Sequence, residues 1–267
     1  MNMDAISHYF DHYVISARIK PAFFVVLPLV VTAIVWWPDA HQLGGVVLTL
    51  LATFGMIGFF SNYISNRGNE LQERLFAEWG GAPTTALLRF GDPHLDPYTR
   101  ERYHRRLEKM IPGLKMPSHK QEKKAPLNAD TCYASAAGFL REHTRDKTRY
   151  PLVYADNVAY GYARNLLVMK LWGIVIAACS VALNIAFLYP GISSYLQMEY
   201  LGPLAVQLQI GLGATAISVL MFGVFAFAVN REYVRGRAVR YAKSLLAACE
   251  VDGQRVNQVD RQIVKIR

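Results

Sequence analysis

Four basic side chains have a spacing in this sequence that could support chemistry. They follow an i, i+3, i+4, i+7 pattern, which places them on one face of a helix: Arg102, Arg105, Arg106 and Lys109. Four cations within two turns repel one another unless an anion is present. The pattern therefore indicates either an anion-binding face or a solvated surface beside anionic lipid headgroups.

A second basic group follows further along the chain. It comprises Arg141, Arg145, Lys147 and Arg149, and Tyr150 comes directly after it. A flexible nucleic-acid strand requires cations that follow its phosphates and aromatic rings that stack on its bases. We therefore expect both basic groups and Tyr150 to contact single-stranded nucleic acid or a nucleotide. A solvated face is again the alternative interpretation.

Polar residues are scarce in the apolar segments of the chain. The candidates for lining a pore are Gln207, Gln209, Thr215 and Ser218. They could do so only if several chains assemble, because four thin helices enclose no channel of their own. Hydrogen bonding between helices is the alternative role. Apart from Lys170 these segments contain no charged residue or His, which argues against ion-coupled transport.

Signatures of catalysis are missing from the sequence. It contains no CxxC, HExxH, GxSxG or GxxxxGK[ST] motif. Arg100 and His104 could be imagined as a nuclease pair, but no acidic partner has a convincing spacing. We therefore expect no enzyme activity, no catalytic residue and no metal or cofactor, and we expect His104 to lie at the surface.

Four long apolar runs are the first of the elements that must position these residues. They are Ala22–Trp37, Leu43–Phe60, Leu166–Tyr189 and Leu201–Val229, in a chain that is 52% hydrophobic and 18% charged. A helix needs roughly 17–25 apolar residues to cross a bilayer. Buried helices of a soluble core are the alternative, but no amphipathic stripe interrupts the runs. We therefore predict four transmembrane helices.

Charge predicts the orientation of these helices. The segments 38–42 and 190–200 contain no Lys or Arg, whereas 65–165 contains most of the basic residues of the chain. Positive charge near helix ends stays in the cytoplasm. We therefore expect a protein of the bacterial inner membrane, with both termini and the segment 65–165 in the cytoplasm.

The predicted fold class is all-α, with a helical cytoplasmic domain inserted between two transmembrane hairpins. The expected parts are an interfacial helix over 1–18, a first hairpin over 19–64, the cytoplasmic domain over 65–165, a second hairpin over 166–229 and a helical tail over 230–267.

Local signals inside the domain predict where its helices begin and end. Asp96–Pro97 predicts the start of a helix that runs to about Ile111. Thr84 is the expected N-cap of a short earlier helix. We expect a solvated loop over 112–127 and a further helix over about 129–147.

A set of motifs in the 70–110 region resembles a family of uncharacterised bacterial inner-membrane proteins. The pattern is WGGxPTT followed by RYH, carried here by Trp79–Gly80–Gly81, Pro83–Thr84–Thr85 and Arg102–Tyr103–His104; Arg145–Asp146 and Asn157 with Tyr160–Gly161 also resemble it. This resemblance implies an architecture and no biochemical role.

The plan of the chain is also similar to that of phage-defence effectors that breach the inner membrane, such as the channel of the Hailong system. That resemblance implies a tetrameric channel, a DNA oligomer bound to cytoplasmic cations, and a nucleotidyltransferase encoded nearby. The expected function is thus an oligomeric inner-membrane effector or ion channel in antiviral defence, gated by single-stranded DNA or a nucleotide. The alternative is a non-conducting membrane scaffold that recruits a cytosolic partner.

Overall fold

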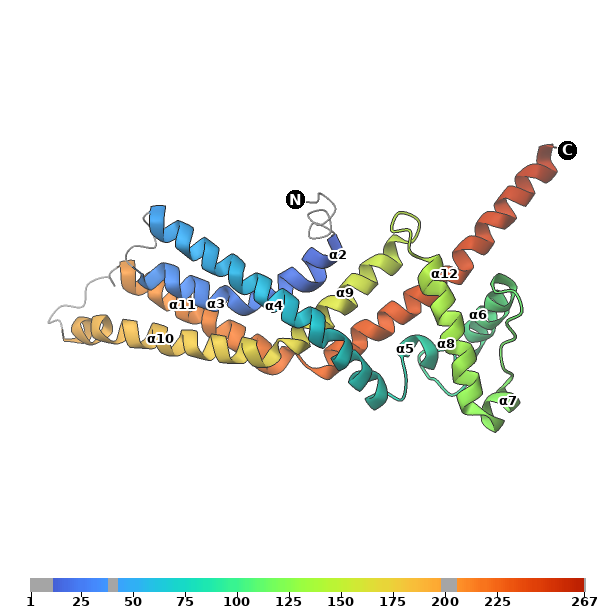
Figure 1. The fold of residues 1–267 in the computed structure, drawn as a ribbon, viewed down its shortest axis with the longest axis horizontal. Helices are drawn as coiled ribbons and strands as arrows, with labels where there is room; N and C mark the ends of the chain where they lie inside the picture. Colours follow the sequence, from blue (N-terminus) through green and yellow to red (C-terminus); the bar gives the residue numbers. More distant parts are fainter. Residues whose placement is uncertain (1–11, 38–42, 198–205, 267) are drawn as a thin grey trace. The chain divides into compact units, whose positions relative to one another are not determined.

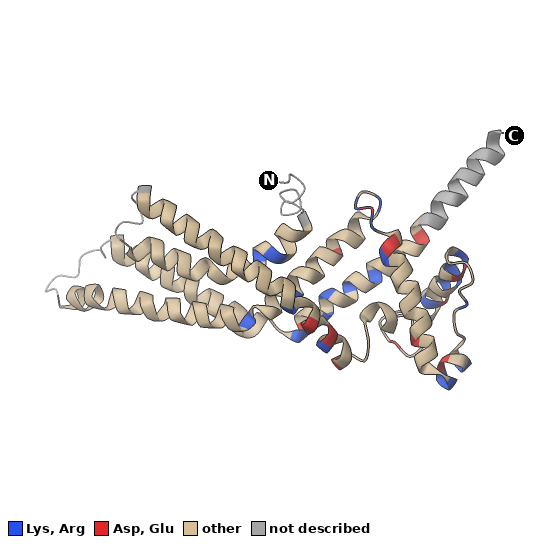
Figure 2. Ribbon diagram, in the orientation of Figure 1, with Lys and Arg blue, Asp and Glu red and all other residues tan. Residues whose placement is uncertain are grey.

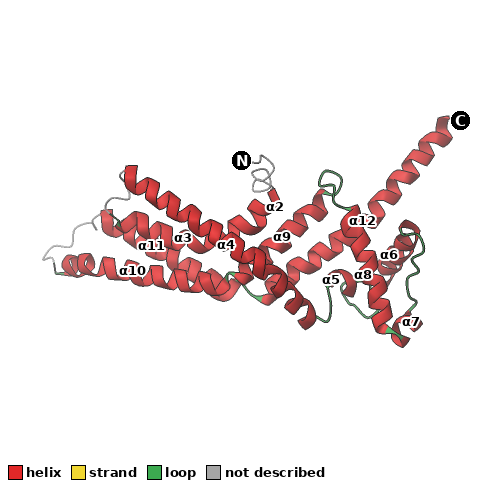
Figure 3. Cartoon of the chain, viewed as in Figure 1, coloured by secondary structure: helices red, strands yellow, loops and turns green. Residues whose placement is uncertain are grey.

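The computed structural model describes residues 12–37, 43–197 and 206–266, with only the backbone of 12, 43 and 252–266. Throughout these ranges the regular structure is helical and contains no strand (Figure 3). The prediction of an all-α chain is confirmed. Most of the predicted interfacial helix, 1–18, falls outside the described residues; inside it, α2 spans His12–Val14.

Four helical segments are long and apolar enough to cross a membrane, and Figure 1 shows them as long, unbroken ribbons. They are η1 (Ile15–Ile19) with α3 (Lys20–Trp36), α4 (Leu43–Glu78), α10 (Lys170–Leu196), and α11 (Val206–Gly223) with η3 (Val224–Ala228). In Figure 2, α3, α10 and α11 carry almost no charged residues, whereas α6 and α7 carry many. The chain is therefore a membrane protein, as the apolar runs predicted.

Three of these helices, α3, α10 and α11, pack against one another around a polar centre. Asn184 is fully buried, and its amide donates to Thr32 Oγ1 (3.0 Å) and Ser218 Oγ (3.4 Å), while Trp36 Nε1 donates to Asn184 Oδ1 (2.7 Å). Gly211 permits this approach, because a Cβ there would lie 2.5 Å from the Trp36 ring. An unpaired amide in an apolar bundle is costly, so this network favours one register of the three helices.

The helix α4 differs from the other three. Only 6% of its apolar window is buried, against 28–33% for the others. Leu51, Phe54 and Phe59 are each more than 60% exposed. A single chain therefore leaves one long apolar face of α4 for lipid or for another helix to cover.

Lys170 has a structural role at the end of η3. Its Nζ donates to the carbonyl oxygens of Ala226 (3.1 Å) and Val229 (2.8 Å). The last carbonyls of a helix have no partner within the helix, so a cation placed there satisfies them. The one cation inside the predicted apolar runs thus closes the end of the fourth segment.

By internal contacts the described residues divide into two compact units. The first comprises 1–71 and 161–234, and the second comprises 72–160 and 235–267. The second unit contains α5 (Pro83–Ala86), α6 (Pro97–Met110), α7 (His119–Lys124), α8 (Pro126–His143), the part of α9 (Pro151–Val168) up to Tyr160 and most of α12 (Arg231–Ile266). Its core is built from residues of α6, α8 and α12 and the turn after α5, among them Leu88, Leu107, Tyr133, Leu140, Leu245 and Leu246.

Helix boundaries in this unit follow the predictions only in part. Asp96 caps α6 as expected, since its carboxylate accepts the Thr99 N–H (2.9 Å). The hydrogen bond with the Thr99 side chain, followed by that with its backbone N–H, lowers the pKa of Asp96. Thr84 was the wrong N-cap, because α5 is preceded by Ala82. The predicted loop contains α7, which Ser118 begins by forming a capping box with Gln121. The helix α8 starts and ends earlier than predicted.

Candidate anion-binding face

The helix α6 presents two different faces. Tyr103 and Leu107 are buried in the core, and burial raises the pKa of Tyr103 to about 12. Pro97 occupies the first turn behind the Asp96 cap, which fixes where the helical repeat starts. The basic residues follow the same repeat with a different phase, so they face away from the core.

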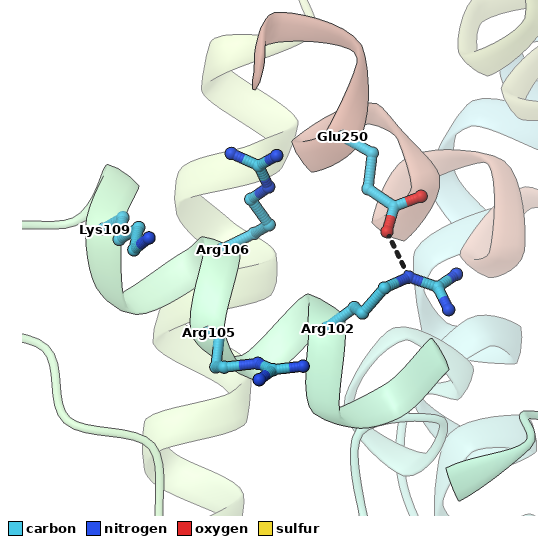
Figure 4. A pocket seen from close by; sticks show the side chains of 5 residues that line it. All are labelled: Arg102, Arg105, Arg106, Lys109 and Glu250. Atoms are coloured by element: carbon cyan, nitrogen blue, oxygen red, sulfur yellow. Dashed lines mark hydrogen bonds and ion pairs between the residues drawn. The ribbon is translucent and has the colours of Figure 1, made fainter. Parts of the chain in front are cut away.

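The structure brings these cations together around a hollow of about 430 Å³. Its lining consists of Arg102, Arg105, Arg106 and Lys109 from α6 and Glu250 from α12. Figure 4 shows the four basic side chains projecting from α6, with Glu250 reaching toward Arg102. We call this surface the α6 face. It is a concentrated patch of positive charge with a single carboxylate at one end.

Arg102 is the member of the α6 face that has a carboxylate partner. Its Nε donates to Glu250 Oε1 at 2.9 Å, and Nη2 donates to Thr99 Oγ1 at 3.1 Å. The hydrogen bond with Glu250, followed by its charge, raises the pKa of Arg102. Arg105, Arg106 and Lys109 form no ion pair with any side chain in the described part of the chain. Their donors are therefore available to an anion.

The second basic group is arranged differently. Arg145 pairs with Glu142 at 2.9 Å, one turn earlier. Lys147 lies 4.9 Å from the centre of the Tyr154 ring, and Arg149 lies 5.5 Å from that of Tyr150. Each of these cations thus has a neighbour within its own stretch of sequence.

Two other residues of the predicted set have separate surroundings. Tyr150 is only 3% exposed and belongs to the core of its unit, so its ring offers little surface to a base. Arg141 lines a different pocket, formed by α4, α5, α8, α9 and α12. The structure therefore brings together four of the nine predicted ligand residues, all of them on α6.

The imagined Arg100–His104 pair is buried, so the expectation of a surface His104 was wrong. His104 is 6% exposed, its Nε2 lies 2.9 Å from the Leu88 carbonyl oxygen, and burial lowers its pKa. Arg100 is 3% exposed and donates to the backbone carbonyls of Phe90, Asp92 and Leu95. Both side chains hold the segment before α6 in place.

The pore candidates lie in different surroundings within the described residues. Ser218 is fully buried beside Asn184 and donates to the Ala214 carbonyl (2.9 Å). Thr215 donates to the Gly211 carbonyl (2.8 Å), an intrahelical bond. Gln207 is exposed and its amide donates to the Val35 carbonyl (2.9 Å); Gln209 is also exposed.

Sequence reasoning missed one member of the α6 face. Glu250 stands 148 positions after Arg102, and no local motif links the two. Only the packing of α12 against α6 places its carboxylate beside the cations. Among the described residues, no three His, Cys, Asp or Glu side chains gather in a way that would hold a metal ion.

Comparison with known proteins found no similarity: no family model matches the chain, and neither does any curated protein or solved structure.

Proposed function

We propose that the chain is an oligomeric effector or ion channel of the bacterial inner membrane, controlled by an anionic ligand on its α6 face. The proposed ligand class is single-stranded DNA or a nucleotide. The resemblance in plan to phage-defence effectors adds three further parts to the proposal: a role in phage defence, a tetrameric assembly and a nucleotidyltransferase encoded nearby. The proposal has both termini and residues 65–165 in the cytoplasm, because Lys and Arg concentrate on that side.

The observation that carries the ligand proposal is the local charge of the α6 face. Three cations line one hollow without a carboxylate partner among the described residues, and the fourth shares one carboxylate. Such a cluster repels itself until a polyanion neutralises it. Arginine donors also match phosphate oxygens geometrically. The contact set of the proposal is therefore Arg102, Arg105, Arg106 and Lys109.

The ligand would act by competing with Glu250. A phosphate that takes the donors of Arg102 removes the ion pair between α6 and α12. The helix α12 follows the fourth membrane segment in the chain after the short link 229–230. A ligand shifts an equilibrium only when it binds the two states unequally. In this proposal the Arg102–Glu250 pair is intact in one state and broken in the other, so the two states differ in their affinity for the anionic ligand.

The membrane segments supply the support for assembly. The apolar face of α4 is uncovered in a single chain. Gly55 and Gly58 on that helix have open space beside them, which suits close packing of helices. Exposed Gln207 and Gln209 are the proposed pore residues. Ser218 is left out, because it is buried among the helices of one chain.

The test is the conductance of the purified full chain in planar bilayers, with and without short single-stranded DNA. We expect a current that the DNA changes. The double variant Arg105→Glu/Arg106→Glu should conduct but lose its response to DNA. The matched control, Arg145→Glu/Arg149→Glu, makes the same charge change in the second basic group and should respond as the wild type does.

A silent bilayer with inserted, oligomeric protein would refute the channel and favour the scaffold. A current that DNA does not alter would refute ligand control while leaving conduction intact. Equal loss of response in both double variants would show that net charge, and not the α6 face, carries the effect.

A further inference from the structure

A second pocket in the 72–160 and 235–267 unit has a composition quite unlike that of the α6 face. It encloses about 380 Å³ between α4, α5, α8, α9 and α12. The residues that matter for its chemistry are Phe76, Thr84, Thr85, Arg141, Asn157 and Tyr160. None of them belongs to the α6 face. We propose that this pocket binds a small organic anion of about mononucleotide size, with one phosphate or carboxylate head and a planar body.

The sign of the ligand's charge follows from Arg141. It is the only charged residue in the lining, so no carboxylate opposes an anion there. Within the described parts of the chain Arg141 has no ion pair or hydrogen bond. Its guanidinium can therefore bind a carboxylate or phosphate in the two-pronged manner that arginine favours. A single cation also matches a ligand with a single anionic head.

The neutral polar groups of the pocket have unused hydrogen-bonding capacity. Thr84 and Thr85 are 6% and 8% exposed, and neither hydroxyl is bonded to another described residue. The amide of Asn157 likewise has no partner among the described residues. Buried polar groups are normally hydrogen-bonded, and a pocket ligand is one way to satisfy groups that face its interior.

The backbone that carries the two threonines is held firmly. Gly81 has φ +132, a region that other residues rarely adopt, and the next two residues lead into α5. Arg89 donates to both carboxylate oxygens of Asp130 on α8 (2.8 and 2.9 Å) and to the Gly80 carbonyl (2.8 Å). This anchoring fixes the position of Thr84 and Thr85 before a ligand arrives, so little ordering is needed on binding.

Aromatic rings form the remaining wall. Tyr160 stacks on Tyr241 with an angle of 2° and a centroid distance of 6.2 Å, and its hydroxyl donates to Gln72 Oε1 (3.0 Å). Both contacts restrain the ring. Phe76, on the last turns of α4, adds an apolar surface. Restrained rings favour a planar ligand body, and the volume lies in the range of small-molecule sites.

The test is isothermal titration calorimetry of the full chain in detergent micelles with four probes. They are adenosine 5′-monophosphate and indole-3-acetate, which have a head and a planar body, adenosine, which has no head, and inorganic phosphate, which has no body. We expect at least one of the first two to bind once per chain. The last two should bind at least about 10-fold more weakly than that probe, because each lacks one of the two recognised parts.

Three variants assign the site. Arg141→Met should weaken the bound probe about 10- to 100-fold, the effect of losing charge-assisted hydrogen bonds. Thr84→Val/Thr85→Val, which keeps the side-chain shape, should weaken it by a smaller factor. Arg145→Met is the matched control one turn away and should leave affinity unchanged. Circular dichroism and thermal unfolding verify that each variant folds.

Measurements on Arg105→Glu/Arg106→Glu separate this pocket from the α6 face. Binding that persists in that variant and is lost in Arg141→Met supports the pocket. Binding that survives Arg141→Met, or that vanishes only when the α6 face is reversed, overturns the proposal. It is equally overturned if neither organic anion binds, or if inorganic phosphate binds as tightly as both.

Discussion

The two basic groups have nearly the same composition and very different surroundings. Each has four cations within a short stretch of chain. On α6 the repeat of one helix gathers all four around a hollow, and three have no carboxylate partner among the described residues. In the second group Arg145 pairs with Glu142, and Lys147 and Arg149 lie over tyrosine rings. The difference shows that the neighbours of a cation, more than its count, determine whether it can bind a ligand.

The largest contrast concerns the tyrosine of the second group. Tyr150 is 3% exposed, so Tyr150→Ala should lower the free energy of unfolding by about 3–5 kcal/mol, as for other large core truncations. Tyr98, at the start of α6, is 78% exposed, and Tyr98→Ala should change it by less than about 0.5 kcal/mol. Denaturant unfolding in micelles measures both. Equal effects would remove the distinction between a core ring and a surface ring.

The next effect is on binding. Arg105→Glu/Arg106→Glu should weaken the affinity for single-stranded DNA about 100-fold, because two charge-assisted interactions become repulsive. The slope of log affinity against log salt should also fall by about 1.4, roughly 0.7 for each phosphate that the variant no longer neutralises. Fluorescence anisotropy with a labelled oligonucleotide at several salt concentrations gives both quantities.

The control for this measurement is Arg145→Glu/Arg149→Glu. It changes the net charge by the same amount, so it accounts for any long-range electrostatic effect. We expect less than about a 5-fold loss of affinity in this variant, since long-range steering alone is screened by salt. A loss as large as that of the α6 variant would contradict the comparison.

Local sequence signals predicted what depends on a single element. The apolar runs gave the four membrane segments, and Asp96–Pro97 gave the start of α6 and therefore the phase of its two faces. Residues in one helix have a fixed angular relation, so the clustering of Arg102, Arg105 and Arg106 followed from their spacing alone. The loop predicted over 112–127 was partly wrong because prolines and lysines masked the capping box at Ser118.

Tertiary contacts account for what the sequence did not predict. Glu250 reaches the α6 face only through the packing of α12. The burial of His104 depends on Phe90 and Tyr133, whose rings lie 5.4 and 5.5 Å from it, and neither belongs to its helix. Likewise the Arg141 pocket takes residues from five helices. The pattern of residues within one segment does not predict such tertiary contacts, because the contacting residues are distant in sequence.

A smaller effect tests the core beneath the α6 face. Burial lowers the pKa of His104 below its ordinary value of about 6.5. The unfolded chain then binds more protons than the folded chain as the pH falls below about 6.5, so stability is full above that pH and decreases below it. The slope cannot exceed about 1.4 kcal/mol per pH unit for one proton. Unfolding midpoints at a series of pH values measure it.

The variant His104→Gln isolates this contribution. A glutamine amide can reach the Leu88 carbonyl as the imidazole Nε2 does, but it does not titrate. We expect the variant to lose the decrease just below pH 6.5 while keeping any change at lower pH, where carboxylates such as Asp96 and Asp146 take up protons. An unchanged profile would show that His104 does not carry the pH dependence.

The smallest expected effect concerns Glu250, the carboxylate partner of Arg102 on the α6 face. Glu250 accepts from Arg102 Nε, and Glu250→Gln removes its negative charge, so the variant should compete less with the ligand and raise DNA affinity about 2- to 5-fold, the modest gain typical of a partly exposed ion pair. In the second group the equivalent change is Glu142→Gln, which frees Arg145. That variant should leave affinity unchanged, because Arg145 does not line the hollow of the α6 face. If both variants bind DNA more tightly by the same factor, the gain comes from net charge. If only Glu250→Gln does, the Arg102–Glu250 pair is the contact with which the ligand competes, and the same variant should then shift the DNA concentration that changes the channel current by a similar factor.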